Sequence, residues 1–560
     1  MNRFKLLLFF LLISFFITRF SNAFETGNYL AAKHAVSNKD YSAAILFFEK
    51  TLDINKVDEK PNQEIAKELC TLYLLEGSIE KCVSIGKKIE KYLNEESASI
   101  LLALITDDIK RNNLDSAFKR LKKVKKHSYE RFSIPIINAW IIAVKNKNYK
   151  ASVDVMSELD KDLHINGLKF LHLALINEFF GKKDEASILY QKSIDTFAEP
   201  SFRLIKLAGN AFERFGEIEK AKDLYKTYSK DSNQSLLISD ELKRLNANKV
   251  PKKEINNLSD AIAELATNIA STFRSDFTNN YSIIYANLAL FLKKDFEVAQ
   301  MFLAELLENE EKFLLANNLY SKISKNSVFD WHAKLRIARN LEILGENSKA
   351  ISILKQMSNE KKDRHDALKL LGDILRNNKK YVEAIKIYNQ ALLRVIDIKK
   401  DNWDLLYARG MAYERSNQWE KAEKDLLKVL EFLPNQPEVL NYLGYSWIEK
   451  GFKMNEAKNL IEKAVNLRPR DPYIVDSLGW AYYKLNEFNK AVVELEKALE
   501  LKPTDPIIND HLGDAYKESE RNIEALYQWK KALYFKPDKE LEKKLQLKIK
   551  EFTEQPSNTF

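Results

Sequence analysis

The sequence is short of the two residues that most often interrupt regular structure. Only 14 of its 560 residues are glycine and only 12 are proline, against average usage of about 7% and about 5%. Turn-dense sheets and glycine-rich phosphate loops are hard to build from such a chain, whereas helices joined by short turns fit it. The apolar content of 45% and the aromatic content of 11% favour a folded over a disordered protein. A chain of this length predicts several domains or an elongated array.

Signatures of catalysis and of metal binding are also missing. The sequence holds no Gly-x-Ser-x-Gly, His-Glu-x-x-His, Gly-Lys-Ser/Thr or Cys-x-x-Cys motif. Its seven histidines are scattered, and no two stand at metal-ligand spacing on one helix face. His511 is expected to be structural, with donation to a ligand as the alternative. We therefore predict a protein that is not an enzyme and that has no cofactor or metal.

Only one long apolar run occurs, and it lies at the amino terminus. Arg3 and Lys5 precede an apolar run over residues 6–17, and Ser21-Asn22-Ala23 places small residues where signal peptidases cut. The run is too short to span a membrane, which takes about 20 residues. We predict a signal peptide over residues 1–23 and an exported mature protein; an uncleaved anchor is the alternative. No cysteine stands at that site, so a lipid anchor is not expected.

A large excess of charge of one sign is missing as well. The net charge of +9 falls to +6 when the signal, with its three basic residues, is removed. Spread over the mature chain this is a weak field, so nucleic acid is not an expected partner. The densest basic run, residues 119–127, is expected to be the solvated end of a helix. The alternative is peripheral membrane association or contact with an anionic polymer.

The sequence does contain a repeat, between Asn441 and Pro537. Three copies begin Tyr-Leu-Gly444-Tyr445-Ser-Trp447, Ser-Leu-Gly479-Trp480-Ala-Tyr482 and His-Leu-Gly513-Asp514-Ala-Tyr516. Each copy continues with an alanine, a second alanine seven residues later and then a proline: Ala457, Ala464 and Pro469; Ala491, Ala498 and Pro503; Ala525, Ala532 and Pro537. The last two sets recur every 34 residues. A period of this size predicts one supersecondary unit stacked on itself.

The residue types predict that this unit is a pair of helices. Glycine and alanine twelve residues apart suit two antiparallel helices, because small residues let the backbones approach where they cross. The aromatic residue after each glycine lies one turn along the same face, and the proline ends the second helix. The copies resemble the tetratricopeptide repeat, whose pattern is Leu-Gly-x-x-Tyr, then Ala, an aromatic residue, Ala and Pro. This resemblance implies an all-α fold, a right-handed α–α superhelical solenoid.

The same small positions can be followed towards the amino terminus, so the resemblance covers nearly the whole mature chain. The first-helix position is held by Ala32, Cys70, Ile105, Ala139, Ala174, Gly209, Ala270, Ala304, Ala338, Gly372 and Gly410 before the three glycines above. The second-helix position is held by Ala44, Cys82, Ala117, Ala151, Ala186, Ala221, Ser282, Ala316, Ala350, Ala384 and Ala422 before the three alanines. We therefore predict about 14 helix pairs.

One long step between repeats, from Ala221 to Ser282, divides this array. We predict a degenerate amino-terminal array over residues 24–230, a linker or insertion over 231–258, which is either a joint or a binding loop, and a second array over 259–537. The protein would thus have two arms. Residues 538–552 are expected to form a polar closing helix, and residues 553–560 a disordered tail.

The only two cysteines, Cys70 and Cys82, occupy the two small positions of one repeat, where its helices should be closest. In an exported protein they are candidates for a disulfide, which would add roughly 3 kcal/mol of stability by closing a short loop. The alternative is that cysteine serves here only as a small apolar residue.

Without a reaction centre, we expect the function to lie on the surface. The first helices of stacked pairs form a concave wall, a groove for peptides or partner helices. In the three clear repeats the positions predicted to face this groove are Asn441, Tyr445 and Ile448; Asp476, Trp480 and Tyr483; and Asp510, Asp514 and Lys517. Aromatic residues flanked by carboxylates are typical of protein-binding hot spots. The alternative is that Trp480 and Tyr483 pack against neighbouring repeats.

The Asn441–Pro537 block is similar to exported repeat proteins of Gram-negative bacteria, some of which are periplasmic adaptors for proteases or cell-wall hydrolases at the outer membrane. The resemblance implies a non-catalytic scaffold in the periplasm that binds proteins or peptides through its groove. Those adaptors are lipid-anchored, and this chain lacks the cysteine for it. The alternative is an accessory subunit of an envelope polymer export or assembly machine. Lys206 and Asn210 match one repeat of a chaperone-type carboxylate clamp, but neighbouring repeats do not complete it, so no clamp is expected.

Overall fold

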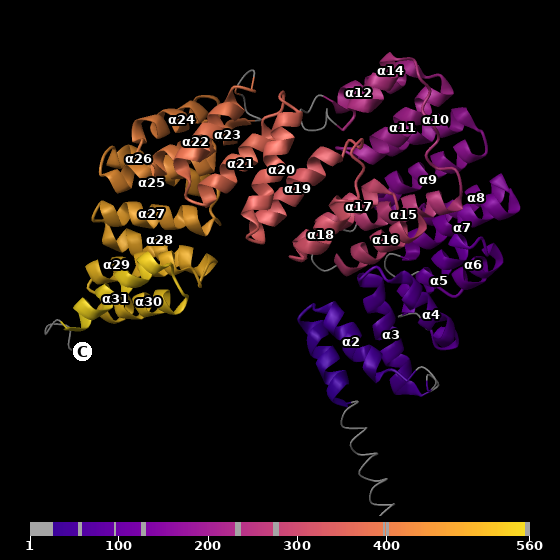
Figure 1. Ribbon diagram of the computed structural model, residues 1–560, viewed down its shortest axis with the longest axis horizontal. Coiled ribbons are helices and arrows are strands. Elements are labelled where there is room, and N and C mark those ends of the chain that lie inside the picture. Colours follow the sequence, from indigo (N-terminus) through magenta and orange to yellow (C-terminus); the bar gives the residue numbers. More distant parts are fainter. Residues whose placement is uncertain are drawn as a thin grey trace, which may run out of the picture. The chain divides into compact units, whose positions relative to one another are not determined.

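The computed structural model describes residues 26–53, 56, 59–93, 97–124, 130–229, 237–272, 279–395, 398 and 402–554. These residues form helices joined by short connections, and no strand occurs among them. They belong to two compact units, Met1–Glu346 (unit 1) and Asn347–Phe560 (unit 2). In both units most consecutive helices pack as antiparallel pairs (Figure 1). The predicted all-α fold of stacked helix pairs is confirmed.

Unit 1 begins with a helical stretch over residues 26–37. Its further helices are α2 (Tyr41–Thr51), α3 (Lys60–Leu75), α4 (Ile79–Ile89), α5 (Ala98–Lys110), α6 (Leu114–Leu121), α7 (Glu130–Asn146), α8 (Tyr149–Val155), α9 (Asn166–Phe179), α10 (Lys183–Asp195), α11 (Phe202–Phe215), α12 (Ile218–Tyr228), α14 (Ser239–Asn246), α15 (Leu258–Thr272), α16 (Asn279–Leu292), α17 (Glu297–Asn309), α18 (Phe313–Tyr320) and α19 (Asp330–Ile343).

Unit 2 contains the clearest repeats. Its helices are α20 (Asn347–Glu360), α21 (Asp366–Asn377), α22 (Tyr381–Leu392), α23 (Trp403–Arg415), α24 (Trp419–Phe432), α25 (Pro437–Lys450), α26 (Met454–Leu467), α27 (Pro472–Lys484), α28 (Phe488–Leu501), α29 (Pro506–Glu518), α30 (Asn522–Tyr534) and α31 (Lys539–Glu554). The closing helix α31 runs two residues beyond its predicted end, and residues 555–560 lie outside the described part of the chain.

The helix boundaries of unit 2 follow from local sequence. Asp471 caps α27, because its carboxylate accepts hydrogen bonds from the backbone N–H groups of Tyr473 and Ile474, and proline fills the first helical position. Asp505 caps α29 in the same way. The second helices α26, α28 and α30 all end shortly before the prolines of the repeat. Capping residues and prolines together therefore set the length of each helix pair.

The small residues do lie where the paired helices cross. Ala457, Ala491 and Ala525 are completely buried. A Cβ atom on Gly444 would come within 2.8 Å of the carbonyl oxygen of Ala457. The glycine also faces the bulky residue of the second helix, as Gly479 faces Leu495, where a Cβ would come within 2.5 Å of Cγ. Glycine is therefore required because the two helices touch there.

Unit 1 departs from a simple stack at helices α15 and α16. They pack on α3, α5 and α7, which are the first helices of earlier pairs (Figure 1). In an open array of repeats, these first helices would line the concave groove. Residues 282–289 of α16 are all buried, which marks a helix enclosed on every face. The Asn287 side-chain amide donates to the backbone carbonyls of Leu74 and Leu75 at 2.9 and 3.1 Å. We had expected an ordinary repeat here; the pair instead fills the interior of unit 1.

The segment 231–258 is not the joint between the two units. The division falls between Glu346 and Asn347, whereas helix α14 of this segment packs on α11 and α12. Pro251 and Ile255 are buried against unit 1. This segment is therefore an insertion folded onto the first array, and residues 230–236 are outside the described range.

The predicted signal peptide, residues 1–23, lies outside the described residues. No helix in the described part combines the length and apolarity that a membrane span requires. Of the basic run 119–127, Arg120 and Lys123 are not free. Arg120 pairs with Glu90 at 2.7 Å and with Asp108, and Lys123 pairs with Glu90 at 3.1 Å.

Candidate functional site

The nine predicted groove residues lie on the first helices α25, α27 and α29 of unit 2, in very different surroundings. Asn441, Tyr445, Trp480, Tyr483 and Asp514 are partly buried and Lys517 is exposed, whereas Asp476, Asp510 and Ile448 are buried. Ile448 is only 2% exposed and belongs to a hydrophobic core cluster with Trp447 and Leu478. The prediction that Ile448 faces the groove is therefore wrong, because this aliphatic side chain packs in the space between repeats.

Trp480 holds three repeats together. Its ring stacks on Tyr483 of the same helix, with centroids 4.7 Å apart, and on His511 of α29, with centroids 4.0 Å apart. Its indole N–H donates to Glu449 Oε1 of α25 at 2.7 Å. Trp480 therefore packs against neighbouring repeats, which is the alternative to a role in ligand binding. Both rings also keep partial exposure, so their binding role stays a prediction.

His511 is paired in the interior. Its Nδ1 lies 2.9 Å from Asp476 Oδ1. Burial by itself lowers the pKa of His511, but the Asp476 carboxylate outweighs burial and holds that pKa above its ordinary value. The histidine and aspartate thus join α29 to α27 across the Trp480 stack.

The closing helix α31 contacts two of the predicted groove residues of α29. Lys548 Nζ lies 2.6 Å from Asp510 Oδ1 and 2.7 Å from Asp514 Oδ2, and Trp529 donates its indole N–H to Asp514 at 3.0 Å. Burial, followed by the neighbouring Asp514 carboxylate, raises the pKa of Asp510. Two of the predicted groove aspartates are therefore occupied by the chain's own lysine. This contact could not be predicted from the sequence, because it depends on how α31 packs against the preceding repeat.

The remaining open part of this face is aromatic and acidic. Burial and the carboxylates of Asp514, Glu518 and Asp510 raise the pKa of Tyr483 to about 12. Burial and the carboxylates of Glu449 and Asp476 likewise raise the pKa of Tyr445. Burial is the largest cause of both shifts, and the carboxylates near each phenol add to it. We call the partly exposed surface of Asn441, Tyr445, Glu449, Trp480, Tyr483 and Glu518 the aromatic face.

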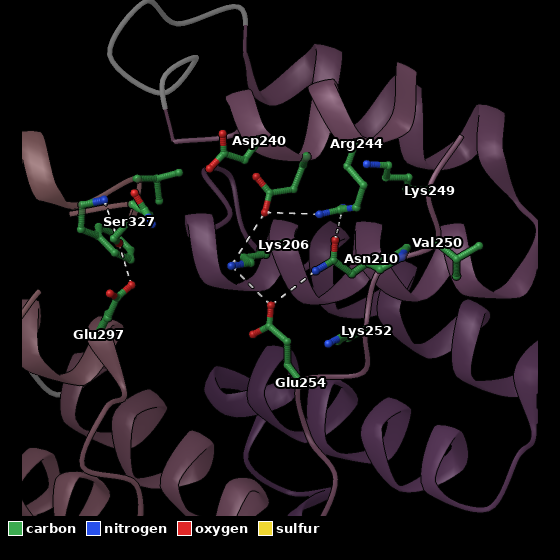
Figure 2. A pocket seen from close by; sticks show the side chains of 15 residues that line it. Lys206, Asn210, Asp240, Arg244, Lys249, Val250, Lys252, Glu254, Glu297 and Ser327 are labelled. Atoms are coloured by element: carbon green, nitrogen blue, oxygen red, sulfur yellow. Dashed lines mark hydrogen bonds and ion pairs between the residues drawn. The ribbon is translucent and has the colours of Figure 1, made fainter. Parts of the chain in front are cut away.

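In the described part of unit 1, α15 and α16 occupy the side that would form a comparable inner wall. Its clamp-like residues Lys206 and Asn210 are engaged internally (Figure 2). Lys206 Nζ lies 3.4 Å from Glu254 Oε1 and 3.8 Å from Glu241 Oε1, and the Asn210 amide donates to Glu254 at 3.4 Å. Partners already hold the groups that a carboxylate clamp would need.

Cys70 and Cys82 form a disulfide between α3 and α4, with their Cα atoms 4.5 Å apart. Both residues are completely buried. The two small positions of one repeat are therefore close enough for the bond.

No constellation of the described residues indicates a reaction. They contain no group of three or more histidine, cysteine, aspartate or glutamate side chains that would hold a metal ion. The described geometry is that of a protein built from paired-helix repeats.

Comparison with known proteins agrees with that class. Residues 371–437 match a family model described as tetratricopeptide repeat, and residues 479–519 match one described as TPR repeat. A TPR repeat-containing protein of Pseudomonas aeruginosa is 30% identical over 189 residues, which are 34% of this chain and 31% of that protein. The matched segment thus spans about a third of the length of this relative.

Solved structures of similar type include yeast Tom70 and a tetratricopeptide repeat protein from Parabacteroides merdae. The first is 12% identical, with a TM-score of 0.38 over 95% of this chain and 96% of that one. The second is 15% identical, with a TM-score of 0.38 over 46% of this chain and 98% of that one. Residues 371–437 and 479–519 are thus similar to tetratricopeptide repeats, and neither family model describes a catalytic family.

Proposed function

We propose that this protein is a non-catalytic scaffold of the bacterial envelope that holds partner proteins on the aromatic face of unit 2. Repeats of this family generally mediate binding between proteins. The observation that carries the proposal is the partly exposed Trp480–Tyr483 stack on α27, bordered by the carboxylates of Glu449 and Glu518. Aromatic anchors within a charged rim are typical of binding hot spots.

The partner segment is expected to be basic and partly apolar. Carboxylates near the two phenols of this face add to burial, the larger cause, in raising the pKa values of Tyr445 and Tyr483. The chain's own Lys484 already pairs with Glu449 at 3.5 Å and lies 5.1 Å from the centre of the Trp480 ring. Lysine or arginine side chains on a partner would bind the remaining carboxylates and the aromatic rings in the same way. Association should therefore weaken as ionic strength rises.

Two observations support the proposed envelope location. A basic start, an apolar run over residues 6–17 and small residues before position 24 support export by a signal peptide. The disulfide of unit 1 suits an oxidising compartment. Periplasmic proteases or cell-wall hydrolases are the partners that the family resemblance suggests.

The test is a crosslinked pull-down of the full chain from bacterial envelopes, with recovered proteins identified by mass spectrometry. Trp480→Ala combined with Tyr483→Ala removes the anchors, and Glu518→Lys reverses an exposed charge without touching the stack. The matched control is Tyr527→Ala on α30 of the same unit, where the side chain is 62% exposed. Each variant is first checked for its helical circular dichroism signal and its thermal midpoint.

We expect one set of proteins that wild type and Tyr527→Ala recover and that both aromatic-face variants lose. Recovery of the same set by a folded double variant would overturn the proposal. Recovery of envelope glycan in place of proteins would instead support an accessory role in polymer export or assembly.

A further inference from the structure

The insertion of unit 1 builds a pocket of its own. Helix α14 and residues 249–254, both from the insertion, form two walls, and α11, Glu297 and residues 326–329 form the others (Figure 2). The cavity measures about 550 Å³, within the range of about 300–1,000 Å³ typical of small-ligand pockets. We call it the insertion pocket.

Glu241 of α14 is the unusual group in its lining. The residue is only 3% exposed, and its Oε1 lies 3.8 Å from Lys206 Nζ and 4.0 Å from Arg244 Nη1. Its Oε2 is buried and has no hydrogen-bond partner among the described residues. A buried acceptor without a donor is costly, so this oxygen is a position that a ligand donor would satisfy.

The surrounding ion pairs leave Glu241 as the carboxylate in excess. Arg203 pairs with Glu264 at 2.7 Å and with Glu254, and Arg244 pairs with Glu213 at 2.6 Å. In this described cluster three cations face four carboxylates: Arg203, Lys206 and Arg244 against Glu213, Glu241, Glu254 and Glu264. Burial raises the pKa of Glu241, and the cations Lys206 and Arg244 offset this effect only in part.

The rest of the lining is mixed in charge and has some apolar surface: Asp240, Glu254 and Glu297 lie beside the basic residues Lys206, Arg244, Lys249 and Lys252. Lys249 and Lys252 are exposed and line the same pocket, and neither has an ion pair with another described residue. Val250, Val328 and Phe329 add apolar surface. A ligand that fits both features carries a cation at one end and an anion at the other.

We propose that the insertion pocket binds a short peptide with free termini, its ammonium group on Glu241 Oε2 and its carboxylate on Lys249 and Lys252. The ammonium group donates the hydrogen bonds that the buried oxygen lacks and supplies the missing positive charge. The insertion would then be a binding device added to the repeat array. This site is separate from the aromatic face of unit 2 and does not depend on it.

The probe is a pool of tripeptides with free termini, mixed with the full chain and read by native mass spectrometry. The same pool with acetylated amino termini, and again with amidated carboxyl termini, tests each end. Glu241→Gln removes the charge with little change of shape, and Glu219→Gln is its control, because that α12 carboxylate is 78% exposed. A double variant, Lys249→Ala with Lys252→Ala, changes only exposed side chains.

We expect one-to-one complexes with free tripeptides, weakened roughly tenfold or more by acetylation or by Glu241→Gln and unchanged by Glu219→Gln. The double lysine variant should bind free and amidated peptides equally. Trp480→Ala with Tyr483→Ala should leave tripeptide binding intact, which separates this site from the proposed scaffold function.

The proposal is overturned if no tripeptide binds at millimolar concentration, or if acetylation leaves binding unchanged. It also fails if Glu241→Gln keeps wild-type affinity with a wild-type thermal midpoint. If Glu241→Gln does not fold, the double lysine variant provides the test. The assignment is refuted if this double variant prefers free over amidated peptides as strongly as wild type does.

Discussion

Replacing glycine by alanine at two equivalent positions of unit 2 should shift stability in opposite directions. Alanine is favoured over glycine inside a helix by about 1 kcal/mol. At Gly410 in α23 a Cβ would meet Leu426 at 3.4 Å and the carbonyl oxygen of Ala422 at 3.5 Å, which are ordinary contacts. Gly410→Ala should therefore raise the free energy of unfolding by up to about 1 kcal/mol.

At Gly444 in α25 the same methyl group would lie 2.7 Å from Ile461 Cγ1 and 2.8 Å from the backbone oxygen of Ala457. The side chain of Ile461 can turn away, but the backbone oxygen cannot. Overpacking of this kind costs about 1–3 kcal/mol, which outweighs the gain in helix propensity. Gly444→Ala should thus lower the free energy of unfolding by up to about 2 kcal/mol.

The assay is urea unfolding of the full chain, followed by far-ultraviolet circular dichroism and by tryptophan fluorescence. Trp447 lies one turn from Gly444 on the same helix, and five of the seven tryptophans belong to unit 2, so the fluorescence transition reports mainly on the unit that is changed. Gly410→Ala is the control for any general effect of adding a methyl group. If both variants shift the midpoint in the same direction, close approach of the helices at the glycine is not what requires that residue.

Three further predictions concern single interactions. Reducing the Cys70–Cys82 bond should lower the stability of unit 1 by roughly 3 kcal/mol, seen as a lower thermal midpoint with reductant; two free thiols in the non-reduced protein would contradict the bond. Glu264→Gln leaves the buried Arg203 with one fewer carboxylate and should cost about 3 kcal/mol; a midpoint within error of wild type in thermal unfolding would refute this. The raised pKa of His511 means that its stabilisation is complete below its unfolded pKa of about 6.5 and is lost as pH rises through the higher folded value. The stability gap between wild type and His511→Gln should therefore be wider at about pH 6 than at about pH 9 in urea unfolding, and an equal gap would count against the ion pair.

The repeating helices were predictable because their determinants are local. Small residues at crossings, capping aspartates and terminal prolines act within one helix pair, so the sequence of each repeat is enough to predict its two helices. The interior position of α15 and α16 was not predictable from these signals, since Ala270 and Ser282 satisfy the repeat pattern equally well there. One indication was available: residues 282–292 contain no charged side chain, which indicates a helix without a solvent face.

The candidate site shows the same limit. The nine predicted groove residues lie on the first helices α25, α27 and α29, because helical spacing determines which side they share, whereas their role in binding stays a prediction. Their partners were not foreseen: Trp480 meets His511 of the next repeat, and Lys548 reaches Asp510 and Asp514 from α31. Such contacts depend on how far one helix pair is rotated against the next, and no single repeat encodes that rotation.

The buried hairpin of α15 and α16 changes how unit 1 can be divided. In an open array, helix pairs can be deleted from either end at a graded loss of stability. Here Asn287 bonds to backbone more than two hundred residues earlier, so a fragment ending before Leu258 would expose the apolar sides of α3, α5 and α7. Deleting the hairpin should therefore abolish folding of the whole unit, and its high contact order predicts slow, all-or-none assembly.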